Sequence, residues 1–502
     1  MSENEGRYTR LQQIGLILGP LLFVGTRLFV TPAELSPQAN AVLASTLWIA
    51  VWWMAEAIPI PATSLLPILL FPTLGVTSVS EAAAPYADPV VFLFLGGFLI
   101  ALAIERWNLH RRIALNVLLR VGDDARYLIL GFMVVTAFLS MWVSNTATAM
   151  MMVPIGMAIV AQVQALQTQE DVTPSYSSPE LESLDVGATP PSNFGAALML
   201  GIAYAASIGG IATIIGTPPN AILVGIAQSS LGVRIGFVQW MLFGLPIAVV
   251  FLAVTWLVLI TLLSPEIRTL PDSQSIIREQ LANLGSMNTG ERRVVVVFAI
   301  VVLGWLLRPF VIEPIAPGIT DTVIALVGGV LVFLIPVNLK QGEFLLNWEY
   351  TTRVPWGVLL LFGAGFSLAK AFQVSGLDQW IAGNLTSLQG IEFLWILLVV
   401  ATLIVFLTEV TSNSATASLF IPVMGSLGAS LAVSPLILMV TVSVAASFAF
   451  MLPVATPPNA IVFGSGYLSI PQMARVGFWL NLLGILFLTV MTYVWLPIVW
   501  GV

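Results

Sequence analysis

Two short polar motifs interrupt apolar sequence in each half of this chain, and their residue types favour ion binding. The segment 144–148 (SNTAT) returns 268 residues later as 412–416 (SNSAT). The segment 217–220 (TPPN) returns 239 residues later as 456–459 (TPPN). The difference of 29 residues matches a polar insertion at about 164–193 that only the first half carries. We therefore predict an internally duplicated chain in which each copy supplies part of one site.

The SNT-type motif predicts the tip of a helical hairpin that ends midway through the membrane. Three consecutive polar residues cannot share one helix face, because each residue turns the chain by about 100°. Hydroxyl and amide groups suit a tip where the N–H groups at helix N-termini lack partners. Such N-termini attract an anion without a basic side chain. A single copy would equally serve as polar contact between membrane helices, whereas two copies at one offset favour a site.

The TPPN motif predicts a broken helix whose carbonyl groups face a cation. Two prolines remove two backbone donors and clash with the preceding turn. Inside a membrane the freed carbonyls need a partner, which a cation provides; a structural kink is the alternative for one copy. Glu56 and Glu409 are the intramembrane carboxylates. Either can bind a proton or a cation, although structural hydrogen bonding at a helix end is the favoured interpretation.

The composition predicts a polytopic membrane protein. Of 502 residues, 58% are hydrophobic and only 9% are charged, with a mean hydropathy of +0.98. The chain has no cysteine and one histidine, His110, which excludes thiol chemistry and a histidine metal cluster. We expect no enzyme activity, no cofactor and no nucleic-acid partner, since there is no basic stripe and no G-x-x-x-x-G-K-[ST] motif. An ion channel would need a continuous polar pore, which hairpins that end midway disfavour.

The apolar segments and the arginines predict the topology. Apolar segments lie near 12–30, 41–58, 62–75, 89–104, 127–161, 194–230, 237–263, 294–313, 321–338, 355–372, 391–430, 433–468 and 473–499. Loops 105–126 and 264–293 are rich in arginine, which predicts that they and the N-terminus are cytoplasmic in a multi-pass plasma-membrane protein. If both hairpins are re-entrant, an odd number of crossings separates the copies and the second copy is inverted.

These motifs, in this order, closely resemble the divalent anion:sodium symporter family, whose members carry dicarboxylates, citrate or sulfate. Glu105-Arg106 followed by 109–114 (LHRRIA) belongs to the same resemblance, which covers nearly the whole chain. The resemblance implies an all-α homodimer with about eleven transmembrane helices, two re-entrant hairpins and two inverted-topology repeats. It also implies an elevator mechanism with scaffold and transport domains. The expected parts are 1–126 and 294–390 (scaffold), 127–263 and 391–502 (transport), and 264–293 (cytoplasmic linker).

The resemblance also implies the site residues. The first sodium site would use Ser140, Ser144, Asn145 and the carbonyl of Gly216. The second would use Thr408, Thr411, Asn413 and the carbonyl of Ala455, with Thr411 acting through its backbone. The substrate carboxylates would meet Asn145, Thr146, Asn413 and Ser414, and Thr217-Pro218 and Thr456-Pro457 would line the gap between them.

The resemblance leads us to expect sodium-coupled symport of C4-dicarboxylates such as succinate, malate and fumarate. Sodium-independent dicarboxylate exchange and sodium-coupled sulfate or citrate transport remain open, because family members of all these kinds share the motifs. Ser414 departs from the pattern: dicarboxylate members commonly have Thr there. This change keeps the hydroxyl and removes a methyl group, which bears on the choice of anion.

Overall fold

The computed structural model describes residues 8–30, 32, 34–170, 192–270, 273–384 and 390–501. Most of the polar insertion predicted at 164–193 therefore lies outside the described residues, although the helix before it continues to Glu170. The helices of the first half are α1 (Arg10–Phe29), α2 (Pro37–Ala55), α3 (Ile60–Thr63), α4 (Leu66–Thr73), α5 (Val79–Ala83), α6 (Pro89–Arg106), α7 (Leu109–Leu118), α8 (Ala125–Ser140), α9 (Asn145–Glu170), α10 (Asn193–Ile211), α11 (Pro218–Leu231), α12 (Phe237–Leu262) and α13 (Ser273–Asn283).

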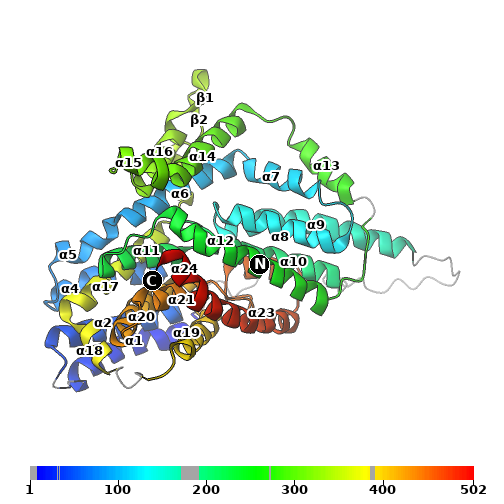
Figure 1. The fold of residues 1–502 in the computed structure, drawn as a ribbon. Helices are drawn as coiled ribbons and strands as arrows, with labels where there is room; N and C mark the ends of the chain where they lie inside the picture. Colours follow the sequence, from blue (N-terminus) through cyan, green and yellow to red (C-terminus); the bar gives the residue numbers. More distant parts are fainter. Residues whose placement is uncertain are drawn as a thin grey trace.

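The helices of the second half are α14 (Thr289–Leu307), α15 (Glu313–Ile315), α16 (Asp321–Leu334), α17 (Trp356–Ser375), α18 (Leu377–Asn384), α19 (Phe393–Thr408), α20 (Asn413–Ser430), α21 (Pro435–Ala445), α22 (Pro457–Phe463), α23 (Ile470–Val490) and α24 (Leu496–Trp500). Two short strands, β1 (Pro336–Asn338) and β2 (Glu343–Phe344), pair antiparallel. Apart from this small ribbon the described chain is helices, turns and loops, which agrees with the expected all-α class (Figure 1).

Among the described residues, seven helices are long and apolar enough to cross a membrane. They are Arg10–Phe29, Val79–Arg106, Asn193–Ile211, Phe237–Leu262, Thr289–Ile315, Trp356–Ser375 and Ile470–Trp500. Shorter apolar helices, among them α8, α9, α19 and α21, end at the hairpin turns or the helix breaks. The expected count of about eleven spans therefore stays a prediction.

Each half contains a helical hairpin packed against a broken helix. In the first half, α8 and α9 meet at a four-residue turn, 141–144, and α10 packs against both. In the second half, α19 and α20 meet at 409–412, and α21 packs against both. The SNT-type motif begins the second arm of each hairpin, because Ser144 and Ser412 precede the first residues of α9 and α20. The broken helices are interrupted at 212–217 and 446–456.

Close helix packing holds these elements together. Every residue of α10 from Phe194 to Ile211 is buried. A Cβ atom at Gly209 would lie 2.2 Å from the carbonyl oxygen of Ala137, so only glycine lets α10 approach α8 this closely. Contacts of this kind, between small residues, are typical of helices packed inside membranes.

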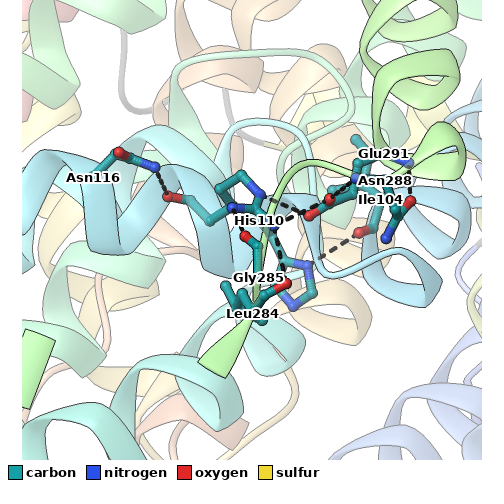
Figure 2. A network of polar contacts seen from close by, with 8 residues as sticks. Ile104, His110, Asn116, Leu284, Gly285, Asn288 and Glu291 are labelled. Atoms are coloured by element: carbon teal, nitrogen blue, oxygen red, sulfur yellow. Dashed lines mark hydrogen bonds and ion pairs between the residues drawn. The ribbon is translucent and has the colours of Figure 1, made fainter. Parts of the chain in front are cut away.

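A buried polar network joins α7 to the segment that leads into α14 (Figure 2). The Arg112 Nε atom lies 2.8 Å from Glu291 Oε1, and the guanidinium also donates to the carbonyls of Leu284 and Gly285. His110 Nδ1 contacts the Ile104 carbonyl oxygen at 3.1 Å. Burial lowers the pKa of His110 below its usual value, although the contact with Ile104 opposes this shift. The network fixes α7 to the helices on which it rests.

Candidate functional site

One cavity of about 1170 Å³ brings the motifs of both halves together. Its lining includes the motif residues Ser144, Asn145, Thr146, Gly216, Thr217, Pro218, Thr411, Ser412, Asn413, Ser414, Ala455, Thr456 and Pro457. The cavity also extends to Thr9 and Gln12 near the N-terminus, to Glu105 at the end of α6, and to Arg353. It exceeds the roughly 300–1,000 Å³ of a pocket for one small ligand, so it combines a site with an access path.

In the first half, the Ser140 hydroxyl, the Asn145 amide and two backbone carbonyls converge beside the hairpin tip. The Ser140 hydroxyl lies 2.6 Å from Asn145 Oδ1 and 2.7 Å from the Ala206 carbonyl oxygen. It has one hydrogen and can donate to only one of them. The same amide atom of Asn145 lies 3.2 Å from the Ala206 oxygen and 3.3 Å from the Gly216 oxygen. The hydroxyl and the two carbonyls are oxygen ligands of the kind that a hard cation such as Na⁺ prefers.

The Asn145 amide joins this cluster by hydrogen bonds. With its nitrogen toward Ser140, it donates to Ser140 Oγ and to the carbonyls of Ala206 and Gly216. This assignment of the amide gives each of these oxygens an N–H donor. Gly210 leaves the space for it, since a Cβ atom there would lie 2.8 Å from Asn145 Oδ1.

The second half repeats the first cluster with a threonine in place of the serine. The Thr408 hydroxyl lies 2.6 Å from Asn413 Oδ1 and 3.0 Å from the Ala446 carbonyl oxygen. Thr411 does not point its hydroxyl at this cluster, because that group donates to the Leu407 carbonyl and contacts Thr416 Oγ1 at 2.8 Å. Ala455, whose carbonyl was the remaining predicted ligand, lines the cavity.

The asparagines of the TPPN motifs hold both helix breaks in shape. Asn220 Nδ2 donates to the carbonyl of Thr213 at 2.8 Å and to that of Gly210 at 3.2 Å. Asn459 Nδ2 donates to the carbonyls of Leu452 and Ala449, both at 3.0 Å. The spacing is the same in the two halves, seven and ten residues before the asparagine. These contacts satisfy backbone groups that a broken helix would otherwise leave without partners.

Comparison with known proteins identifies the family of this chain. A family model described as the sodium:sulfate symporter transmembrane region matches residues 12–502. The chain belongs to this family, the divalent anion:sodium symporters.

Two known transporters match almost the whole of this chain. A sodium-dependent dicarboxylate transporter of Staphylococcus saprophyticus is 45% identical over 495 residues, which cover 98% of this chain and 92% of the relative. The transporter of the same name from Staphylococcus aureus strain USA300 is 42% identical over 505 residues, 100% of this chain and 94% of the relative. The solved structure of the Alcanivorax borkumensis YdaH transporter shares the fold, with a TM-score of 0.58 at 16% identity over 91% of this chain and 99% of that one.

The predicted site residues of this symporter line the cavity, except Ser140 and Thr408. These two are fully buried; Ser140 contacts Asn145 and Thr408 contacts Asn413. The sequence analysis missed the carbonyls of Ala206 and Ala446, because an alanine carries no side-chain signal. It also quoted Asn220 and Asn459 without a role, although their position after two prolines is a signal for a side chain that caps a break.

The two carboxylates singled out in the sequence have different surroundings. Glu56 lines the cavity at the end of α2, where its backbone is left-handed with φ of 47°. Glu409 is 3% exposed and accepts hydrogen bonds from backbone N–H groups. Glu409 thus makes the kind of structural hydrogen bonds that the sequence analysis favoured.

Proposed function

We propose that this symporter takes up C4-dicarboxylates together with Na⁺. The observation that carries this proposal is the pair of matching polar clusters, Ser140–Asn145 and Thr408–Asn413, whose asparagines line one cavity. The names of the staphylococcal relatives, sodium-dependent dicarboxylate transporters, support the choice of ion and substrate. Ser414 lacks the methyl group of the threonine that is common at this position in dicarboxylate members, but its hydroxyl remains available to a carboxylate.

The site would bind a dianion through helix N-termini and neutral side chains. The helices α9 and α20 begin at Asn145 and Asn413, and both residues face the cavity. Each helix N-terminus acts as roughly +0.5 charge, and its first N–H groups lack partners within the helix. We expect one substrate carboxylate to meet Asn145 and Thr146, and the other to meet Asn413 and Ser414.

Sodium would complete the site before the substrate binds. A Na⁺ at each polar cluster fixes the adjacent asparagine and hence the hairpin tip that receives a carboxylate. Two Na⁺ neutralise a dianion, which eases movement of the loaded site across the membrane. A third would leave one net positive charge, so that transport would be favoured by about 2.3 kcal/mol per 100 mV of inside-negative potential.

The whole-molecule mechanism we propose is an elevator built from inverted repeats. The transport parts, 127–263 and 391–502, would move against the scaffold parts, 1–126 and 294–390, in a homodimer. The cytoplasmic side would carry the N-terminus and the Arg-rich loops 105–126 and 264–293. In support, those two loops bond each other, with Ala125 N donating to the Arg268 carbonyl at 3.0 Å. A cavity that reaches Thr9 and Glu105 would then open to the cytoplasm.

Uptake by proteoliposomes tests this function. We expect radiolabelled succinate to accumulate under an inward Na⁺ gradient, with less uptake of citrate and sulfate. The control replaces Na⁺ with K⁺. Succinate uptake that proceeds unchanged without Na⁺ but requires a trans dicarboxylate would identify an exchanger, and preferential sulfate uptake would identify a sulfate transporter.

A further inference from the structure

Glu409, at the tip of the second hairpin, is bound entirely by N–H donors. Its Oε1 accepts from the backbone N–H groups of Phe450 at 2.7 Å and Met451 at 2.9 Å. Its Oε2 accepts from the Leu452 N–H at 3.1 Å. Asn481 Nδ2, on α23, donates to Oε1 at 2.7 Å. A carboxylate only accepts hydrogen bonds, so it matches this set of donors. An amide in its place would bring its own NH₂ group, a donor, up to these N–H donors.

The donors belong to a helix break that is longer in the second half than in the first. With the 239-residue offset of the TPPN motifs, Ile211, the last residue of α10, corresponds to Phe450. The helix α21, however, already ends at Ala445. The N–H groups of 450–452 therefore have no helical carbonyl partners. Glu409 supplies the acceptors that a continuing helix would have supplied.

The first half has no counterpart of this carboxylate. With the 268-residue offset of the hairpin motifs, Glu409 corresponds to Met141, which carries no side-chain acceptor of comparable strength. There the turn after α10 is closed by the backbone, with Ala212 N donating to the Gly209 carbonyl at 3.0 Å. The two breaks thus share their capping asparagines but differ in how their N–H groups are satisfied.

The face of α23 that meets the break carries Gly477 and Asn481, one helical turn apart. A Cβ atom at Gly477 would lie 2.1 Å from the Phe450 carbonyl oxygen, so glycine is required for this approach. In the first half Gly244 approaches Ile211 in the same way, with 2.6 Å between its would-be Cβ and that carbonyl oxygen. The close approach is common to both halves, and the Glu409–Asn481 hydrogen bond is the addition.

We propose that Glu409 is a positioning residue that shapes the second sodium site through the break it holds. The break runs from Ala446, whose carbonyl accepts from Thr408, to Ala455 and Thr456 at the cavity. Glu409 also directly follows Thr408 in the chain. The second site therefore depends on a carboxylate that the first site lacks, and the two sodium ions bind with different affinities. This inference rests on the proposed sodium coupling.

The test compares Glu409→Gln and Asn481→Ala with a matched control, Glu266→Gln. Glu266 also accepts from a backbone N–H, that of Phe194 at 3.0 Å, and from Ser192 Oγ at 2.8 Å, but it does not line the cavity. In proteoliposomes we expect Glu409→Gln to raise the Na⁺ concentration for half-maximal succinate uptake about tenfold, since it disrupts hydrogen bonds to a charged group. The succinate KM at saturating Na⁺ should change by less than about twofold. Asn481→Ala should shift the Na⁺ dependence in the same direction by less, and Glu266→Gln should not shift it.

A second readout measures Na⁺ binding without transport. The chain has no cysteine, so V454C introduces a single thiol at a residue that lines the cavity within the break and is 79% exposed. We expect Na⁺ to slow maleimide labelling of V454C, and Glu409→Gln to move this protection to higher Na⁺ concentration. Where Glu409→Gln yields no folded protein, Asn481→Ala in the V454C background decides.

Four results would overturn the inference or its basis. An unchanged Na⁺ dependence in Glu409→Gln rejects the role of Glu409 and leaves the sodium site itself standing. Where Glu409→Gln does not fold, an unchanged Na⁺ dependence in Asn481→Ala has the same meaning. Equal shifts in Na⁺ dependence and succinate KM point to general structural damage and also reject this role. Absence of any Na⁺ effect on V454C in the parent protein rejects the sodium site, and sodium-independent uptake by that protein rejects the proposed coupling as well.

Discussion

At the scale of single residues, the site combines side chains with backbone carbonyls. The recurrence of 144–148 as 412–416 was what predicted a polar tip, because Ser, Thr and Asn in a single copy would equally be contacts between membrane helices. The backbone partners at Ala206 and Ala446 could not be predicted, because any residue has a carbonyl and only the fold directs it. The direction of a side chain is equally hidden in the sequence. The Thr411 hydroxyl donates to the Leu407 carbonyl within the hairpin and not to the cluster.

Replacing Asn145 or Asn413 with Ala should reduce sodium-driven succinate uptake to background. Each substitution removes the amide of one polar cluster and a proposed carboxylate contact, and contacts to charged ligands contribute on the order of 1.5–3 kcal/mol each. Uptake by proteoliposomes measures the loss, and size-exclusion chromatography checks that the protein assembles as the parent does. Near-normal uptake by both variants would refute the site.

At the scale of elements, the sequence predicted helix breaks but not their lengths. The prolines of each TPPN motif require an interruption, and both interruptions are present. The N–H groups beyond the early end of α21 bond Glu409, and Glu409 meets Asn481 only because α23 packs against the hairpin. The polar ribbon at 336–344 was equally hidden, since its five strand residues carry no clear alternation.

The Arg112–Glu291 pair should contribute strongly to the stability of the packing of α7. The Glu291 side chain is 2% exposed, so Arg112→Met leaves a buried carboxylate without its cation. We expect a loss of about 3–5 kcal/mol in the free energy of unfolding. Thermal unfolding of the purified protein measures it.

The matched control for this pair is Glu313→Gln. It removes a partner of Arg308 whose side chain is 50% exposed, and it should cost no more than about 1 kcal/mol. Equal effects of Arg112→Met and Glu313→Gln would show that burial does not decide the strength of these pairs.

At the scale of the whole molecule, the duplicated motifs predicted that distant halves share one site. Asn145 and Asn413 line one cavity, so the described structure brings both motifs together. That this cavity is the transport site stays a prediction. The arrangement of scaffold against transport parts was taken from the family resemblance, because apolar periodicity alone does not say which helices move together.

Single cysteines test the predicted orientation, since the chain contains none of its own. S78C lies in the loop 76–88 that has no Lys or Arg, and R120C lies in the Arg-rich loop 105–126. A membrane-impermeant maleimide added to intact cells should label S78C at once and R120C only after permeabilisation. The opposite pattern would place the N-terminus outside.

The hydrogen bonds of the Asn145 amide bear on the empty half of the transport cycle. A carrier that has released its cargo must reset without bare oxygen atoms crossing the low-dielectric interior. With its nitrogen toward the cluster, the amide donates to Ser140 Oγ and to the carbonyls of Ala206 and Gly216. In the proposed cycle these oxygens would therefore keep a hydrogen-bond donor while the unloaded protein returns.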